Sequence, residues 1–187
     1  MYKQCQTEQS AARQREMEQG LLRLMRKMPY DEISVSNLCE EIGVPRKSFY
    51  RYFSNKDGAL FALLDHTLLE FTQASGDRNG QSDGVFGDLE RFFIFWYEHK
   101  TLLSALQRSR LSGLLVERAT SHALHERLMP AYLIDKDPSI QQMSMTFTIC
   151  GLLSMVLAWH NENYRETPQK MAETATAMLT KPLIQGK

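Results

Sequence analysis

The sequence has few cysteines, glycines and prolines, and no excess of charge of either sign. Its 187 residues include three cysteines, ten glycines and six prolines, and its 22 basic side chains balance 22 acidic ones. An odd number of widely spaced cysteines (Cys5, Cys39 and Cys150) predicts neither a disulfide framework nor a zinc cluster. So few turn-forming residues argue against a many-stranded β-sandwich. The net charge of zero indicates no anionic partner by itself.

The N-terminus also lacks the features of a secretory signal. It reads Tyr2-Lys3-Gln4, with no apolar stretch behind the charge. We therefore expect a protein of the reducing cytoplasm, in agreement with the low cysteine content.

What the sequence does contain is apolar residues at helical spacing over nearly its whole length. Hydrophobic residues make up 43% of the chain, which is enough for a sizeable core. A first apolar stripe runs from Met17 to Met28 and ends at Pro29, because the residue before a proline avoids helical geometry. Further helices are predicted over 60–71, from Leu89 onward, over 101–129 (one or two helices), over 138–163 and over 168–183. A glycine-rich loop is predicted between them, at Gly76, Gly80, Gly84 and Gly87. No alternating strand pattern of useful length is present, so the predicted fold class is all-α.

One apolar segment is long enough to raise the question of a membrane. No acidic or basic residue lies between Asp137 and Glu162, and Met143 to Trp159 is strongly apolar. This stretch is shorter than the roughly 20 residues that span a bilayer, and hydroxyl side chains interrupt it. We predict a buried helix and no membrane partner.

The charges are unevenly distributed although they cancel overall. The first 56 residues carry three more basic than acidic side chains, and Val44 to Lys56 contains four cations and no acid. A basic stretch of this kind is either a solvated helix face or a surface for an anionic partner.

The residues around this basic stretch predict a helix-turn-helix. Ser34 can cap a short helix, and Gly43 supplies the left-handed residue of a tight turn. Pro45 then opens a second short helix whose Phe49 and Phe53 point inward at i and i+4. A polar second helix after such a turn fits the major groove of DNA.

The outward face of the second helix has the side chains that nucleic acids require. Arg46 and Lys47 can reach base edges, where paired donors meet guanine O6 and N7. Tyr50, Tyr52 and Lys56 are placed to hold phosphates, and Ser36 can donate to a phosphate at the start of the first short helix. The predicted DNA-binding residues are Ser36, Arg46, Lys47, Ser48, Tyr50, Arg51, Tyr52 and Lys56.

This segment resembles the DNA-binding region of TetR-family transcriptional regulators. The resemblance rests on the run from Ser34 to Val44, with its cap and its Gly-Val turn, and on the run from Lys47 to Leu60, with Tyr50-Arg51-Tyr52-Phe53 and Asn55-Lys56-Asp57. It covers roughly 9–69. The chain departs from the family pattern at three positions, Cys39, Pro45 and Gly58, and Pro45 affects the capping geometry of the recognition helix.

The resemblance implies a two-domain, all-α regulator of about nine helices. A three-helix DNA-binding domain would occupy 1–56 and a helical ligand-binding and dimerisation domain 57–187. Weaker likeness at Gly151-Leu152-Leu153, Trp159 and 168–172 implies a homodimer through the last two helices, and the apolar 143–159 stretch supports this. Such a dimer would place two recognition helices about 34–36 Å apart on a palindromic operator of double-stranded DNA.

The resemblance also implies a pocket for a small-molecule effector in the second domain. The candidate lining residues are Phe71, Phe92, Phe93, Trp96, Tyr97, His122, Met155 and Trp159, which combine apolar walls with a few polar tips. Aromatic residues at helical spacing are more often core residues, and that alternative stays open. Effector binding would tilt the helix around 60–71 and release a repressor from its operator.

Catalysis is not expected, and neither are a cofactor and a metal site. His122 and His125 lie at i and i+3 beside Glu126, yet no His-Glu-x-x-His motif is present and surface histidines explain the pattern. There is no phosphate-binding glycine loop or nucleophile elbow. The competing hypothesis is a helical dimer that binds other proteins and whose N-terminal region does not read DNA.

Overall fold

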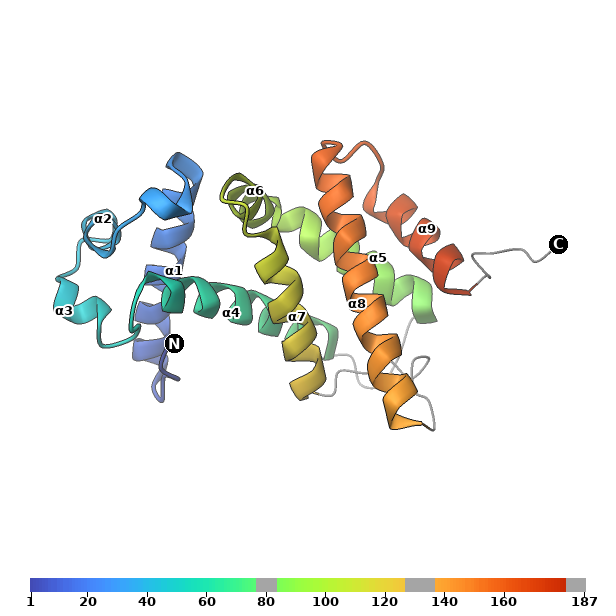
Figure 1. Cartoon of the computed structure of the whole chain (residues 1–187), viewed down its shortest axis with the longest axis horizontal. Helices are drawn as coiled ribbons and strands as arrows, with labels where there is room; N and C mark the ends of the chain where they lie inside the picture. Colours follow the sequence, from blue (N-terminus) through green and yellow to red (C-terminus); the bar gives the residue numbers. More distant parts are fainter. Residues whose placement is uncertain (77–83, 127–136, 181–187) are drawn as a thin grey trace. The chain divides into compact units, whose positions relative to one another are not determined.

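The computed structural model describes residues 1–76, 84–126 and 137–180, and within these residues the chain is all-α, as predicted (Figure 1). Predictions that fall at Gly80, at 127–130 and at 181–183 lie outside the described residues. The helices are α1 (Glu8–Lys27), the 3-10 turn η1 (Tyr30–Glu32), α2 (Val35–Glu41), α3 (Arg46–Phe49), α4 (Lys56–Gly76), α5 (Gly84–Glu98), α6 (Lys100–Arg108), α7 (Ser112–Glu126), α8 (Pro138–Asn161) and α9 (Pro168–Thr180).

These helices form two compact units. The first contains Met1–Leu68 and Thr101–Arg118, and the second contains Leu69–Lys100 and Ala119–Lys187, so that α4 and α7 each contribute to both. The two units do not divide at residue 56, where the sequence predicts the end of the DNA-binding domain, and that functional boundary stays a prediction. Residues 101–118 join the first unit because Arg108 and Ser109 bond to the N-terminal helical segments. The Arg108 guanidinium donates to the carbonyl of Arg26 (2.7 Å), and the Ser109 hydroxyl accepts from the backbone N–H of Tyr30 (3.1 Å).

The core of the first unit lies under the predicted helix-turn-helix. Met17, Leu21 and Met25 on α1 are fully buried, as the apolar stripe predicts. α1 packs against α2, and α2 packs against α3. Further fully or almost fully buried members come from the other elements: Leu38, Phe49, Phe53, Leu60, Leu64, Leu102, Leu103, Leu106 and Leu115.

The core of the second unit is aromatic. α5 packs against α9. Phe93 and Trp96 on α5 and Trp159 on α8 are buried, and the rings of Phe93 and Trp159 meet edge to face with centroids 5.9 Å apart.

Helix α8 begins at Pro138, as predicted, but only one side of it is buried. Leu153, Val156 and Trp159 are buried, whereas Met143 and Phe147 are each 68% exposed. Among the described residues, α8 is the one helix long and apolar enough to cross a membrane, and 28% of its apolar window is buried. Length and composition alone are weak evidence for a membrane, because helices of globular proteins meet the same test. The prediction of a buried helix is therefore correct for one face and wrong for the other.

Three of the four glycines of the predicted loop belong to helices. Gly76 ends α4, whereas Gly84 and Gly87 belong to α5. Val85 and Phe86 lie four and three residues before the buried Leu89, so the helical face of α5 continues backward across these positions. Packing of this face outweighs the low helix propensity of glycine.

Candidate nucleic-acid interface

Helix α2 begins where the sequence predicts, with a complete cap. The Ser34 hydroxyl accepts from the backbone N–H of Asn37 (3.1 Å), and the Asn37 side chain accepts from the backbone N–H of Ser34 (2.9 Å). This reciprocal pair satisfies two of the N–H groups that a helix start leaves without partners. The cap fixes the residue at which α2 begins.

The turn after α2 has the geometry that glycine allows. Gly43 has φ +66°, its N–H donates to the carbonyl of Glu40 (3.2 Å), and the N–H of Val44 donates to the carbonyl of Cys39 (3.0 Å). These two bonds form a Schellman motif, which ends a helix and reverses the chain. The turn therefore places the second helix directly against the first.

The second helix, α3, is a single turn over Arg46–Phe49, and further turns follow it. Pro45 occupies the cap position without a side-chain hydrogen bond, so a feature that departs from the family pattern leaves this helix start uncapped. Phe49 and Phe53 are buried at 0% and 1% exposure, with ring centroids 5.1 Å apart, as their spacing predicts. Their packing holds α3 on the protein, because one turn of helix has little stability of its own.

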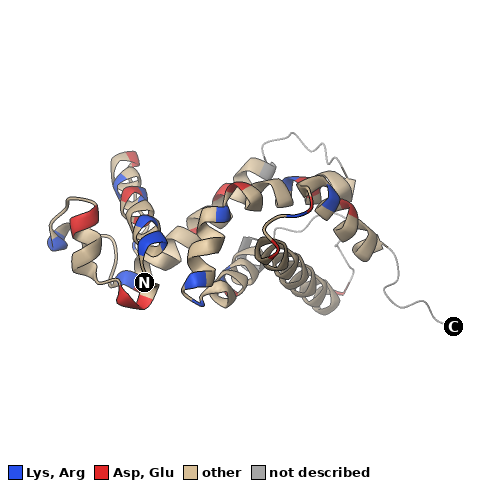
Figure 2. Cartoon of the chain, turned by 90° about the horizontal axis from the view of Figure 1, so that it is seen from above, with Lys and Arg blue, Asp and Glu red and all other residues tan. Residues whose placement is uncertain are grey.

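The opposite side of α3 is basic and accessible. Arg46, Lys47 and Arg51 are exposed, and within the described residues none of them has an acidic partner. Tyr50 is 46% exposed, and its hydroxyl accepts from the Arg46 guanidinium (3.4 Å), which raises the pKa of Arg46. Figure 2 shows the basic positions on this ribbon, beside acidic positions on α2. Three accessible cations on one short element form a surface suited to phosphates and base edges.

Other predicted DNA-binding residues are less accessible. Ser36, Ser48 and Tyr52 are half-buried. Ser36 lies in the first turn of α2, beside the N–H groups of the helix start, and its contact with a phosphate stays a prediction. Ser48 and Tyr52 lie on α3 and in the turn that follows it, at the edge of the basic surface.

Lys56 has a different environment from the predicted one. Its ammonium donates to the carbonyls of Tyr30 (2.7 Å), Asp31 (3.3 Å) and Ile33 (2.8 Å), and lies 4.3 Å from the centroid of the Tyr30 ring. These bonds use all three of its N–H donors. The reason is its place at the start of α4, beside the outward carbonyls that end the η1 turn. Lys56 therefore links the start of α4 to the η1 segment, and its ammonium is not a free charge in this DNA-free structure.

One acidic side chain of α2 pairs with two cations of α1. Glu41 binds Arg23 (3.2 Å) and Lys27 (2.8 Å), and these two cations lower the pKa of the Glu41 carboxyl. Arg23 and Lys27 are therefore less available to an anionic partner than the exposed cations Arg46, Lys47 and Arg51.

The candidate effector residues gather in the second unit, but most of them form a packed cluster. Trp96 and Phe93 are buried, Phe71 contacts Phe92 and Phe95, and Tyr97 contacts Trp159 and Tyr164. Burial raises the pKa of Tyr164 to about 12. Tyr97 is 39% exposed, and Met155 is half-buried.

Three side-chain polar atoms of this unit are buried without a hydrogen-bond partner in the described part of the chain. They are Trp96 Nε1, His122 Nε2 and Thr176 Oγ1. Buried polar atoms are normally paired, so each of these is a candidate ligand contact. His122 is half-buried, which corrects its interpretation as a surface histidine.

Sequence reasoning missed the residues that brace the helix-turn-helix from behind. Tyr2 donates to Asp65 (2.7 Å), and Arg118 forms an ion pair with the same carboxylate. The fully buried Glu18 contacts His66 Nδ1 (2.9 Å). The one available signal was Gly58, a departure from the family pattern that the structure explains by a close approach of Met1.

Comparisons with known proteins agree with this geometry. Residues 20–63, which include α2, α3 and the start of α4, match the profile described as "Bacterial regulatory proteins, tetR family". No curated protein matches the chain.

Two solved structures have a similar fold over most of the chain. The fatty acid degradation regulator FadR from Bacillus halodurans is 14% identical with a TM-score of 0.61, covering 91% of this chain and 95% of that one. A tetR-family transcriptional regulator from Streptomyces coelicolor is 21% identical with a TM-score of 0.59, covering 87% and 78%. Residues 20–63 therefore carry a helix-turn-helix that matches the tetR-family profile of bacterial regulatory proteins, and most of the chain shares the all-α fold of these regulators.

Proposed function

We propose that this regulator is a homodimeric repressor that binds a palindromic operator and leaves it when a small-molecule effector binds. The observation that carries the DNA-binding part is the basic, outward surface formed by Arg46 and Lys47 on α3 and Arg51 in the turn after it. All three are exposed, and none has an acidic partner among the described residues. Arg46 and Lys47, in the first turn of α3, would contact base edges. Ser36, Ser48, Tyr50, Arg51 and Tyr52 would contact phosphates and fix the register.

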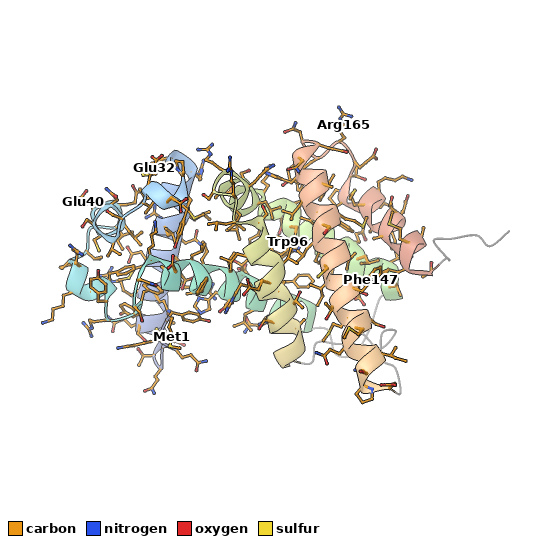
Figure 3. The ribbon with its side chains drawn as sticks, in the orientation of Figure 1. Met1, Glu32, Glu40, Trp96, Phe147 and Arg165 are labelled. Carbon is orange, nitrogen blue, oxygen red and sulfur yellow. The ribbon has the colours of Figure 1, made fainter. Side chains whose placement is uncertain are left out.

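The dimer is supported by an exposed stripe on α8. Ile140, Met143, Phe147 and Gly151 recur at i, i+3, i+7 and i+11, and all four are exposed (Phe147 is labelled in Figure 3). No Lys, Arg, Asp or Glu lies between Pro138 and Asn161 (Figure 2). An uncharged apolar stripe that the described residues leave exposed fits a second copy of itself, related by a two-fold axis. Met178 on α9, which is 48% exposed, would extend this interface onto the last helix.

The effector site is supported by the unpaired atoms of Trp96 and His122 in an aromatic surrounding. An indole N–H can only donate, so the effector would carry a carbonyl or carboxylate oxygen on an apolar body. Fatty acids are suitable first probes, because one structural neighbour is named as a fatty acid degradation regulator. Effector binding would favour a conformation with a different tilt of α4, in which DNA affinity is lower.

The decisive experiment is a selection of bound fragments from random duplex DNA by the purified protein. Recovery of an inverted repeat with half-sites one helical turn apart would support both sequence-specific reading and two-fold symmetry. Enrichment of no sequence would contradict the proposal. A thermal-shift screen of fatty acids and other metabolites tests the effector, because a bound ligand raises the melting temperature.

The alternative function is a protein-interaction module without DNA reading. The salt dependence of DNA binding separates the two proposals. A DNA reader loses affinity steeply as salt rises, and its slope falls when an exposed cation of α3 is removed. If substitution of both Arg46 and Lys47 leaves DNA binding unchanged, the alternative is favoured.

A further inference from the structure

The first residues of the chain pair with the segment that follows α3. Tyr2 forms an isolated antiparallel bridge with Phe53. The N–H of Lys3 donates to the carbonyl of Tyr52 (2.9 Å), and the N–H of Ser54 donates to the carbonyl of Met1 (3.1 Å). We call Met1–Lys3 the N-terminal clamp.

The Tyr2 side chain ties the clamp to α4. In a bridge of this kind opposite residues point to the same side, so Tyr2 lies on the side of the buried Phe53. Its hydroxyl donates to Asp65 (2.7 Å), and its ring meets the ring of His66 edge to face at 5.8 Å. Asp65 is itself held by the Arg118 guanidinium (2.7 Å to Nε). The side chain of Tyr2 therefore attaches the clamp to α4.

Helix α1 also bonds to the end of this segment. Gln14 is buried, and its side-chain amide donates to the carbonyl of Lys3 (3.2 Å) and accepts from the Cys5 thiol (2.8 Å). A buried amide that bonds to both the backbone and a side chain of this segment favours one arrangement of the backbone.

Gly58 on α4 leaves the space that the clamp occupies. A Cβ built at this position would lie 2.5 Å from the carbonyl oxygen of Met1. Met1 itself is labelled in Figure 3, in the first unit. A glycine in the first turns of a helix costs stability relative to alanine, so its presence here is accounted for by the close approach of Met1.

We propose that the N-terminal clamp orients α3 for DNA binding, because it holds the following residues, Tyr52–Ser54, against α1 and α4. This inference rests on the proposed DNA-binding function. Since α3 is a single helical turn, the direction of its basic side chains depends on how both of its ends are held. The buried side chains of Phe49 and Phe53 anchor α3 in the core, and the N-terminal clamp bonds to the backbone of Tyr52 and Ser54, which follow α3.

A pair of variants at one position isolates the backbone contact. Lys3→Pro removes the N–H that bonds to Tyr52, and Lys3→Ala keeps it, while both remove the same charge. An extended segment tolerates proline, as does the residue before it. We expect the proline variant to bind an operator duplex from the selection about threefold to tenfold more weakly than the alanine variant, with the same salt slope.

Amide hydrogen exchange measures the clamp without DNA. The Ser54 amide bonds to Met1, so its exchange should be faster in Lys3→Pro than in Lys3→Ala. Equal exchange at Ser54 would overturn the clamp. Faster exchange with equal DNA affinity would overturn its positioning role. If the unmodified protein binds no duplex at all, the proposed function fails, and the exchange comparison still decides whether the clamp exists.

A substitution on α4 tests the clamp independently of Lys3. Gly58→Ala should accelerate exchange at Ser54 and weaken DNA binding, although alanine favours the helix. The control is Gly113→Ala on α7, where a Cβ would meet nothing within 4 Å. This control should leave Ser54 exchange and DNA affinity unchanged. An unchanged Ser54 amide in Gly58→Ala would contradict the proposal even if Lys3→Pro failed to fold.

Discussion

Replacing Lys56 by methionine separates a structural lysine from a DNA-binding one. The Lys56 ammonium donates three hydrogen bonds to backbone carbonyls and lies over the Tyr30 ring, and methionine keeps the straight side chain but none of these interactions. We therefore expect the substitution to lower protein stability and to leave the number of DNA phosphate contacts unchanged.

The size of the stability loss follows from these contacts. A hydrogen bond from a charged group contributes about 1.5–3 kcal/mol, and a cation–π contact at a partly exposed site about 0.5–1 kcal/mol. The three bonds share one half-buried ammonium, and water can replace part of them in the variant. The expected decrease in the free energy of unfolding is therefore about 2 kcal/mol, or about 4–8 °C in melting temperature.

Lys47→Met is the matched control, because Lys47 is exposed on α3 and loses the same charge. Urea unfolding should show a change under about 0.5 kcal/mol for this control. Fluorescence anisotropy with operator DNA across a salt series should show its slope falling by about one per protomer. If Lys56→Met gives the slope change and Lys47→Met gives the stability loss, the assignment of Lys56 to the protein interior is refuted.

Three further predictions address the DNA contact, the dimer and the pH dependence. Arg46→Ala should weaken operator binding by about 1–3 kcal/mol and reduce discrimination among operator variants in competition assays; undiminished discrimination would mean that Arg46 contacts no base. Phe147→Glu, at a side chain that is 68% exposed, should give a folded monomer in analytical ultracentrifugation, and a surviving dimer would exclude an interface on this face. The folded state binds the Tyr164 proton more tightly than the unfolded state, because the pKa is about 12 against an ordinary 10.0. The free energy of unfolding should therefore decrease as pH rises from 10 to 12, and by less in Tyr164→Phe; an identical decrease in urea titrations of both proteins would contradict this.

The sequence was sufficient to predict the helices whose ends are marked by proline. Pro29 follows the end of α1 by two residues, and Pro138 and Pro168 begin α8 and α9. The cap at Ser34 and the left-handed turn at Gly43 were also predictable, because each depends on neighbouring residues alone. The prediction of the helix-turn-helix is confirmed for the same reason: its signals are local.

Features that depend on distant residues were not predictable. The partners of Lys56 are carbonyls more than twenty positions earlier, and a lysine at a helix start gives no sign of which acceptors it will meet. The N-terminal clamp is three extended residues without periodicity. The exposed side of α8 was ambiguous as well, because a helix that is apolar all round has no preferred face until its neighbours are known.

The glycine at position 58 has a consequence for the evolution of this protein. Any side chain there would collide with the carbonyl of Met1, so mutation at one site is constrained by the course of the chain at another. Among descendants of a common ancestor, lineages that gain a larger residue at 58 should also have rerouted, altered or lost their leading residues. A survey of natural variation could therefore identify this arrangement from covariation alone.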